Sequence, residues 1–263
     1  MTKHIRFSPN RKAWATVPDG SPLVRYGIVR GDTVYETDSL WSTDTKEEFA
    51  FSDVRLLPPC WPSKIVCVGR NYADHAKELG NAVPAEPLIF YKPVSSLIAS
   101  GDSIVYPPIS QLVSFEGEVG VVIARQAKNV RVEDAASFVF GYTIVNDMTA
   151  RDLQKKDGQW ARAKGFDTFC PTGPWIVPAR EVDFDSLRIR TWVNGEQKQD
   201  GSVKDMIFPV SAIIAYVTQF LTLEPGDLIA TGTPPGVGPV EPGNTIRVEI
   251  EGIGALENTV VRG

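Results

Sequence analysis

The chain has 263 residues, of which 43% are hydrophobic and 22% are charged, and it carries a formal net charge of −5. This composition suits a globular protein with a sizeable core, and the acidic balance without a basic run argues against nucleic-acid or anionic-membrane partners. No signal peptide is recognised, and the longest apolar stretch, 210–223, is too short to span a bilayer.

Residues 1–57 are predicted to form a small β-rich N-terminal domain. Its clearest element is a hairpin over 25–35 that turns at Gly31-Asp32. A proline-rich stretch over 57–62 marks the boundary to a second domain, 58–263. Nothing in the first domain is expected to be catalytic, so packing or dimer contacts are its predicted role.

The second domain is predicted to begin with a strand over 64–68 and a short helix over 74–79, which Gly80 ends. Thr149 to Asp152 has the pattern of a capping box that opens a helix reaching Lys156. Many strands, few helices and no regular βαβ alternation predict an α+β fold rich in β-structure. The remaining expected elements are strands over 88–91, 103–106, 119–124 and 142–146, a helix over 209–221, and a strand-rich end.

Three cysteines, Cys60, Cys67 and Cys170, give neither a disulfide framework nor a zinc knuckle, because their number is odd and no two are close. Reduced structural thiols in a cytoplasmic protein are the simplest interpretation. The only histidines are His4 and His75, which excludes any site that needs several imidazoles.

Two acidic residues lie inside the apolar segment 115–123, which is predicted to be one buried strand. Residues two apart on a strand share a face, so the Cβ atoms of Glu116 and Glu118 would lie about 6–7 Å apart. Unit charges at that distance repel by roughly 2–3 kcal/mol at an effective dielectric near 20. A hard divalent cation is the usual compensation; the alternative is an edge strand with both side chains in solvent.

Asp147, at the end of the apolar strand 141–146, is the best candidate for a third metal ligand. Asp152 is left out, because its expected role is the capping of Thr149. Three carboxylates favour Mg²⁺, Mn²⁺ or Ca²⁺ over zinc, and they leave open positions at which a substrate binds.

A possible acid–base pair is formed by His75 and Glu78, which are three residues apart on the predicted helix. The pair can take a proton from water near neutral pH, and the glycines around it suggest a mobile lid. Surface helices also carry this spacing by chance. Lys164 is flanked by small and apolar residues and either faces an anion or is solvated at a helix end.

Arg151 and Gln154 share one face of the helix that follows Asp147, and they are candidates to point into the same cleft. The segment 230–239 does not match a nucleotide-binding loop, since neither Gly-Lys-Ser/Thr nor a helix follows it. We expect a stiff turn there, with backbone N–H groups that face a carboxylate.

Taken together, these stretches resemble the fumarylacetoacetate hydrolase family over about residues 60–260. The matching motifs are GRNYADH (69–75), FYKP (90–93), FEGE (115–118), NDMTARDLQ (146–154), AKGFD (163–167) and TGTP (231–234). The resemblance implies a mixed β-sandwich or roll with a small N-terminal domain, usually as a homodimer. It implies Mg²⁺ or Mn²⁺, with Ca²⁺ as a further candidate, held by Glu116, Glu118 and Asp147.

The resemblance also implies a lid that carries His75 and Glu78 and orders when substrate binds, with Lys164 as a third catalytic residue. It implies that Lys164 and Gln154 contact the substrate, and the further predicted substrate-binding residues are Arg70, Tyr72, Lys92, Arg151 and Thr233. The expected substrates are small 2-oxo acids and 1,3-diketo acids.

The sequence therefore predicts a metal-dependent hydrolase that cleaves a C–C bond in 2,4-dioxo, acylpyruvate-type acids and releases pyruvate. In this hypothesis His75 and Glu78 activate a water, while Lys164 stabilises the developing oxyanion. Alternatively, the same site decarboxylates oxaloacetate-like acids or isomerises 2-hydroxy-diene-dioates in aromatic catabolism. A non-catalytic metal-stabilised scaffold would leave the His75–Glu78 pair and Lys164 without roles.

Overall fold

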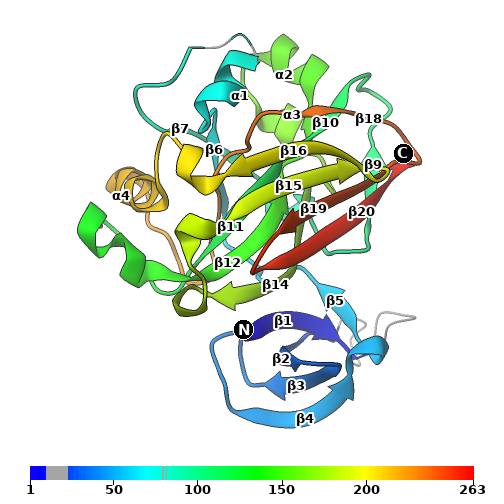
Figure 1. The fold of residues 1–263 in the computed structure, drawn as a ribbon, viewed down its shortest axis with the longest axis vertical. Coiled ribbons are helices and arrows are strands. Elements are labelled where there is room, and N and C mark those ends of the chain that lie inside the picture. The colour runs from blue at the N-terminus through cyan, green and yellow to red at the C-terminus, as the bar shows by residue number, and fades with distance from the viewer. Residues whose placement is uncertain (10–22, 79, 81) are drawn as a thin grey trace.

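The computed structural model describes residues 1–9, 23–78, 80 and 82–263, and strands dominate it (Figure 1). The largest sheet has 12 strands within these residues, with the main order β4-β3-β2-β1-β14-β12-β11-β17-β6-β7 and with β5 beside β1 and β8 beside β14. A five-stranded sheet has the order β16-β15-β19-β20-β9, and a three-stranded sheet the order β13-β10-β18. Parallel and antiparallel pairs both occur, so the predicted β-rich α+β fold is confirmed.

The strands of the largest sheet are β1 (Lys3–Ser8), β2 (Arg25–Arg30), β3 (Thr33–Thr37), β4 (Thr45–Ala50), β5 (Arg55–Leu57), β6 (Ile65–Gly69), β7 (Leu88–Lys92), β8 (Leu97–Ile98), β11 (Gly117–Ile123), β12 (Val139–Asn146), β14 (Cys170–Pro178) and β17 (Leu228–Ala230). The five-stranded sheet contains β9 (Ser103–Tyr106), β15 (Arg188–Val193), β16 (Glu196–Ser202), β19 (Thr245–Ile250) and β20 (Gly254–Arg262). The three-stranded sheet contains β10 (Val113–Phe115), β13 (Thr149–Ala150) and β18 (Gly238–Val240). The α-helices are α1 (Ala73–Glu78), α2 (Arg151–Asp157), α3 (Ala161–Lys164) and α4 (Val210–Phe220).

The N-terminal strands form one end of the largest sheet, drawn in blue in Figure 1. Strands β2 and β3 pair antiparallel around Gly31-Asp32, as the hairpin pattern predicts. Strand β1 also pairs with β14, where His4 lies opposite Ile176. The first 57 residues are therefore joined to the rest by backbone pairing, and a domain boundary at 57/58 stays a prediction.

Strand β11 lies at the centre of the fold, and each of its residues is buried. Val119 and Val121 pack in the main hydrophobic cluster together with Ile189 of β15, while Val122 packs in a second cluster. Alternate side chains of a strand point to opposite faces, so both faces of β11 are covered. A charge on this strand therefore needs a buried partner beside it, either a side chain of opposite charge or a metal ion.

The helices show where local patterns succeed and fail. Helix α4 follows Pro209 as expected, but the capping box at Thr149 is wrong. Thr149 lies in β13, and α2 begins at Arg151 without a side-chain cap. The Asp152 carboxylate instead accepts hydrogen bonds from Ser110 Oγ (2.7 Å) and the Gln111 N–H (3.0 Å). In the described chain, no helix combines the length and apolar character that a membrane crossing requires.

Candidate active site

The strand expected over 115–123 is interrupted, because the chain changes sheets at Glu116. Phe115 ends β10 in the three-stranded sheet, whereas Gly117 begins β11 opposite Asn146 in the largest sheet. At the break, the Glu116 N–H donates to the side-chain Oδ1 of Asn146 (3.0 Å). A side chain thus replaces the strand partner that this backbone group would otherwise need.

Three buried carboxylates meet at this break. One oxygen from each of Glu116, Glu118 and Asp147 lies within 4.8 Å of the others. Asp147 follows β12 directly, and its N–H donates to the Glu116 carbonyl (2.8 Å), which fixes the end of β12 against the break. A cluster made only of carboxylate oxygens fits a hard divalent cation such as Mg²⁺, Mn²⁺ or Ca²⁺.

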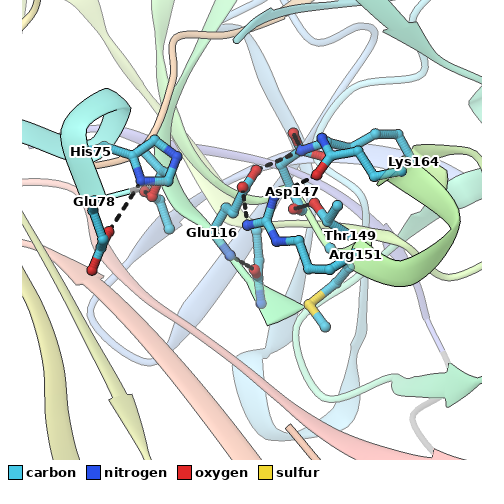
Figure 2. A network of polar contacts seen from close by, with 12 residues as sticks. His75, Glu78, Glu116, Asp147, Thr149, Arg151 and Lys164 are labelled. Carbon is cyan, nitrogen blue, oxygen red and sulfur yellow. Dashed lines mark hydrogen bonds and ion pairs between the residues drawn. The ribbon is translucent and has the colours of Figure 1, made fainter. Parts of the chain in front are cut away.

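Positive side chains already gather at two of these carboxylates (Figure 2). Lys164 Nζ donates to Glu116 Oε2 (2.5 Å) and Asp147 Oδ2 (2.6 Å), Lys92 Nζ donates to Asp147 Oδ1 (2.6 Å), and the Arg151 guanidinium donates to Glu116. Although burial opposes ionisation, Arg151 and Lys164 hold the pKa of Glu116 below its ordinary value. The alternative that Lys164 is solvated at a helix end is wrong, because its side chain is buried.

Glu118 differs from the other two carboxylates. It accepts a hydrogen bond from the Gly232 N–H (2.8 Å), but no cationic side chain of the described residues pairs with it. Burial, and then the charges of Asp147 and Glu116, raise the pKa of Glu118 well above its ordinary value. A divalent cation would supply the positive charge that Glu118 lacks, so the donor set and its electrostatics both fit a metal.

The turn expected within 230–239 contacts β11 next to the carboxylate cluster. Gly232 donates to the Glu118 carboxylate, as the prediction of N–H groups facing a carboxylate requires. The hydroxyls of Thr231 and Thr233 donate to backbone carbonyls of β11 (2.9 Å each). Gly232 has a φ of +98°, and an added Cβ would lie 2.7 Å from the Cβ of Asn71, so glycine is required there.

Gln199 of β16 was not found by sequence reasoning, although it is part of the same arrangement. Its Oε1 accepts from the Gly117 N–H (3.1 Å), and its Nε2 donates to Thr233 Oγ1 (2.8 Å) and to the Pro234 carbonyl (2.8 Å). Gln199 therefore fixes the one residue between Glu116 and Glu118. Its polar strand gives no local signal that this glutamine, unlike its neighbours, is buried.

His75 and Glu78 are in contact on α1, with 3.3 Å between His75 Nδ1 and a Glu78 carboxylate oxygen. Glu78 also accepts from the Gly236 N–H at 3.1 and 3.2 Å. Burial lowers the pKa of the His75 imidazole, against the opposing effects of Glu116 and Glu78. In Figure 2 the second ring nitrogen of His75 is turned toward the side on which Glu116 lies.

A cavity of about 470 Å³ opens onto the carboxylates. Nine of the sequence-predicted site residues line it: Arg70, His75, Glu116, Glu118, Asp147, Arg151, Gln154, Lys164 and Thr233. The other described lining residues are Val68, Gly69, Phe90, Lys155 and Trp160, which the site prediction did not include. The aromatic pair Phe90 and Trp160, with ring centroids 5.2 Å apart, comes from segments far apart in sequence, so no local pattern could reveal it.

Three predicted site residues do not line this cavity. Tyr72 is buried in the main hydrophobic cluster, and its hydroxyl has no hydrogen-bond partner in the described part of the chain. The ammonium group of Lys92 is enclosed between Asp147 and the Met148 carbonyl (3.1 Å). The positions of Tyr72 and Lys92 therefore do not support the substrate contacts expected of these two residues. The third residue, Glu78, is oriented toward His75 and Gly236.

Comparison with known proteins agrees with this geometry. Residues 64–261 match the model for the fumarylacetoacetate (FAA) hydrolase C-terminal domain, and residues 3–59 match the Rv2993c-like N-terminal domain. Human mitochondrial oxaloacetate tautomerase FAHD2B is 46% identical over 222 residues, which cover 80% of this chain and 71% of that protein.

Two solved structures show the likeness in three dimensions. The 2-hydroxyhepta-2,4-diene-1,7-dioate isomerase of Mycobacterium marinum has a TM-score of 0.87 and 42% identity, and the match covers 100% of this chain and 99% of that chain. The fumarylacetoacetate hydrolase of Exiguobacterium antarcticum has a TM-score of 0.85 and 38% identity, and the match covers both chains fully, at 100% each. With a family model that matches most of its length and relatives aligned over the whole fold, the chain belongs to the fumarylacetoacetate hydrolase family.

Proposed function

We propose that this chain is a metal-dependent isomerase that shifts protons within small 2-oxo acids, by keto–enol tautomerisation or by movement of a conjugated double bond. One observation carries the proposal: the buried His75 imidazole faces the same cavity as the three-carboxylate cluster. The tautomerase and isomerase named among the relatives support this reaction class over hydrolysis.

The residues can divide the work as follows. A divalent cation held by Glu116, Glu118 and Asp147 would polarise the 2-oxo group and favour charge on its oxygen. In this proposal Nδ1 of His75 carries the proton and donates to the Glu78 carboxylate 3.3 Å away, so that Nε2 is the unprotonated nitrogen that acts as the base. Nε2 then takes a proton from the carbon next to the 2-oxo group and returns it to another position of the substrate. Because burial lowers the pKa of His75, the imidazole is neutral at physiological pH and ready to act as the base.

Lys164 and Arg151 add fixed positive charge near the developing negative oxygen. Both line the cavity and donate to the carboxylate cluster, so they are held in place before substrate arrives. Preorganised charge of this kind stabilises an enolate without reorganisation during the reaction. Gln154 accepts from Arg151 Nη1 (3.1 Å) and orients its guanidinium.

Hydrolysis of acylpyruvates with release of pyruvate is the second candidate. It is favoured by the contact between His75 and Glu78, since a His–carboxylate pair can also take a proton from a water. Isomerisation, in contrast, needs only one base and no positioned water. His75 lines the cavity in the described part of the chain, whereas Glu78 does not, so the cavity offers the one base that isomerisation needs. Decarboxylation of oxaloacetate-like acids would use the same stabilised enolate.

A direct test uses chelator-stripped protein with Mg²⁺ or Mn²⁺ restored. We expect the enol form of oxaloacetate to be converted to the keto form only when the metal is present, and no pyruvate to be released. The loss of the ultraviolet absorbance of the enol measures this conversion. If pyruvate is released from acetylpyruvate faster than enol-oxaloacetate is ketonised, the protein is a hydrolase and the proposal is wrong. If pyruvate is released from oxaloacetate at such a rate, the protein is a decarboxylase. Metal binding without any turnover of these acids would favour the scaffold hypothesis.

We further propose Mg²⁺ or Mn²⁺ as the metal, a homodimer as the working unit, and a cytoplasmic location. The oxygen-only ligand set supports either metal, and the family resemblance supports the dimer. The three cysteines, all free and buried, are consistent with a reducing compartment. Light scattering after size-exclusion chromatography tests the dimer, and a mass equal to that of one chain would contradict it.

A further inference from the structure

A buried asparagine lies between helix α1, which carries His75, and the turn 231–236, which contacts Glu118. We propose that Asn71 is a positioning residue, which fixes α1, and with it the base His75, relative to the metal ligand Glu118. This inference rests on the proposed function, because the distance between a base and a metal ion matters only if both act on one substrate.

The first argument is that the hydrogen bonds of the buried Asn71 side chain are complete. Its Nδ2 donates to the carbonyls of Thr231 (2.8 Å) and Phe208 (3.0 Å), and its Oδ1 accepts from the Phe208 N–H (2.8 Å). An amide that uses both its donors and its acceptor on backbone groups has a fixed orientation, and its removal leaves those groups unpaired. Asn71 does not line the cavity in the described part of the chain, so it can act only through the segments that it holds.

The second argument is the peptide group that joins Thr231 to Gly232. Its carbonyl accepts from Asn71 Nδ2, and its N–H donates to Glu118 Oε2 (2.8 Å). A trans peptide group is planar, and its C=O and N–H point in opposite directions. One rigid unit therefore joins Asn71 on one side to the metal ligand on the other. If Asn71 is lost, the N–H that orients the Glu118 carboxylate is no longer fixed from behind.

The third argument is the short helix that follows Asn71. Helix α1 has six residues, and an isolated helix of that length is not stable in water. Contacts at its ends must therefore decide where His75 lies. Near the start of the helix, the Asn71 carbonyl accepts from the Ile207 N–H (2.8 Å), in addition to the contacts of the Asn71 side chain with Phe208 and Thr231.

The turn 231–236 also contacts the other end of α1. The Gly236 N–H donates to the Glu78 carboxylate at 3.1 and 3.2 Å. Asn71 before the helix and Glu78 at its last residue thus attach α1 to one turn, and that turn also contacts the metal ligand. His75 lies between these two attachments, so both determine where its imidazole lies relative to the carboxylate cluster.

The test compares Asn71→Ala with Asn258→Ala in the full chain, by two measurements that do not depend on turnover. Asn258 is the matched control, because it is 3% exposed and its Nδ2 also donates to two backbone carbonyls, those of Ala99 and Asp102 (2.8 Å each). It does not line the cavity within the described residues.

The first measurement is the affinity for Mn²⁺ by calorimetry. We expect Asn71→Ala to bind Mn²⁺ about 10- to 100-fold more weakly, as when an outer-shell partner of a metal ligand is lost. Asn258→Ala should bind the ion as tightly as the unchanged protein.

The second measurement is the NMR titration of the two histidines, His4 and His75, in chelator-stripped protein. His75→Gln assigns their signals, and His4 in β1 is the internal reference. Burial is the largest effect on the pKa of His75 and lowers it; Arg151 lowers it too, whereas Glu116 and Glu78 raise it. When α1 is no longer held and water reaches the imidazole, this pKa should rise toward 6.5, while that of His4 stays unchanged.

Asn71→Ser repeats both measurements with a smaller perturbation, in case Asn71→Ala does not fold. Its hydroxyl can replace one of the lost hydrogen bonds, so we expect smaller changes of the same sign. Unchanged Mn²⁺ affinity, an unchanged pKa of His75, or equal changes in Asn258→Ala would each overturn the proposal, because it requires that Asn71 in particular acts on both the metal ligand and the base.

The same variants separate this inference from the proposed reaction. If both measurements change in Asn71→Ala but the unchanged protein isomerises no 2-oxo acid, the reaction is wrong and the positioning role of Asn71 stands. If isomerisation is observed and Asn71→Ala behaves like Asn258→Ala, the reaction stands and Asn71 has no positioning role.

Discussion

At the scale of single residues, Glu118 is the carboxylate whose charge the protein alone does not balance. Replacing it by glutamine removes a buried like charge and keeps an oxygen that accepts from Gly232. We therefore expect Glu118→Gln to leave the melting temperature of metal-free protein unchanged or slightly higher, and to abolish the rise in melting temperature on adding Mg²⁺.

The activity of Glu118→Gln should fall by about 10²-fold or more, as when an electrostatic stabiliser of a transition state is removed. Thermal melts with and without Mg²⁺ make the comparison, and Glu196→Gln, at an exposed position, is the control. An undiminished Mg²⁺-induced shift would show that Glu118 does not bind the ion.

His75 should determine the acidic limit of activity. Burial lowers its pKa below the ordinary value of 6.5, so the imidazole remains neutral until the pH falls through that lowered pKa. If the neutral form is the base, kcat/KM is maintained at higher pH and is lost only below 6.5.

The neighbouring Glu78 raises the pKa of His75, so Glu78→Gln should move the acidic limb of the pH profile to still lower pH. The pH dependence of kcat/KM for both proteins measures this directly. A limb that moves to higher pH in the variant would contradict the assigned relation between the two residues.

At the scale of elements, the junction between β10 and β11 depends on a side chain from the facing sheet. Gln199 of β16 holds Gly117 and Thr233, and so fixes the spacing between Glu116 and Glu118. We expect Gln199→Leu to weaken Mn²⁺ binding by about 10- to 100-fold, as loss of an outer-shell partner typically does. Calorimetry measures the affinity, and Gln197→Leu, exposed on the same strand, is the control. Equal affinities would assign Gln199 a purely structural role.

Gly117 tests how tightly the two sheets are packed at this junction. An added Cβ would lie 2.4 Å from Thr191 Oγ1 and 2.9 Å from Val248 Cγ1. Gly117→Ala should therefore lower the free energy of unfolding by about 1–3 kcal/mol, the usual range for overpacking. Gly238→Ala is the matched control, because its nearest contact would be an ordinary 3.6 Å. Urea denaturation curves compare the two, and equal stability would contradict the packing described.

At the scale of the whole molecule, the features that the sequence could predict are those set by neighbours along the chain. The hairpin at Gly31-Asp32 and helix α4 follow from turn residues and apolar spacing, and the motifs led to the acidic cluster. The sheet change at Glu116 could not be predicted, because it depends on Asn146 and on strands far along the chain. The partner of Asp152 was missed for the same reason: Ser110 is brought to it by the pairing of β10 with β13.

Strand β11, enclosed on both faces, would also make the stability of the whole fold respond to a divalent ion bound at the carboxylate cluster. Its amide hydrogens can exchange with solvent only when the surrounding sheets separate, so their exchange should report global opening rather than local fluctuation. Because Glu118 lies in this strand, Mg²⁺ should slow the exchange of all β11 amides by one common factor, set by its concentration and affinity. Amide hydrogen exchange measured by NMR would then report how much of the metal site is occupied, even at residues of β11 that do not contact the ion.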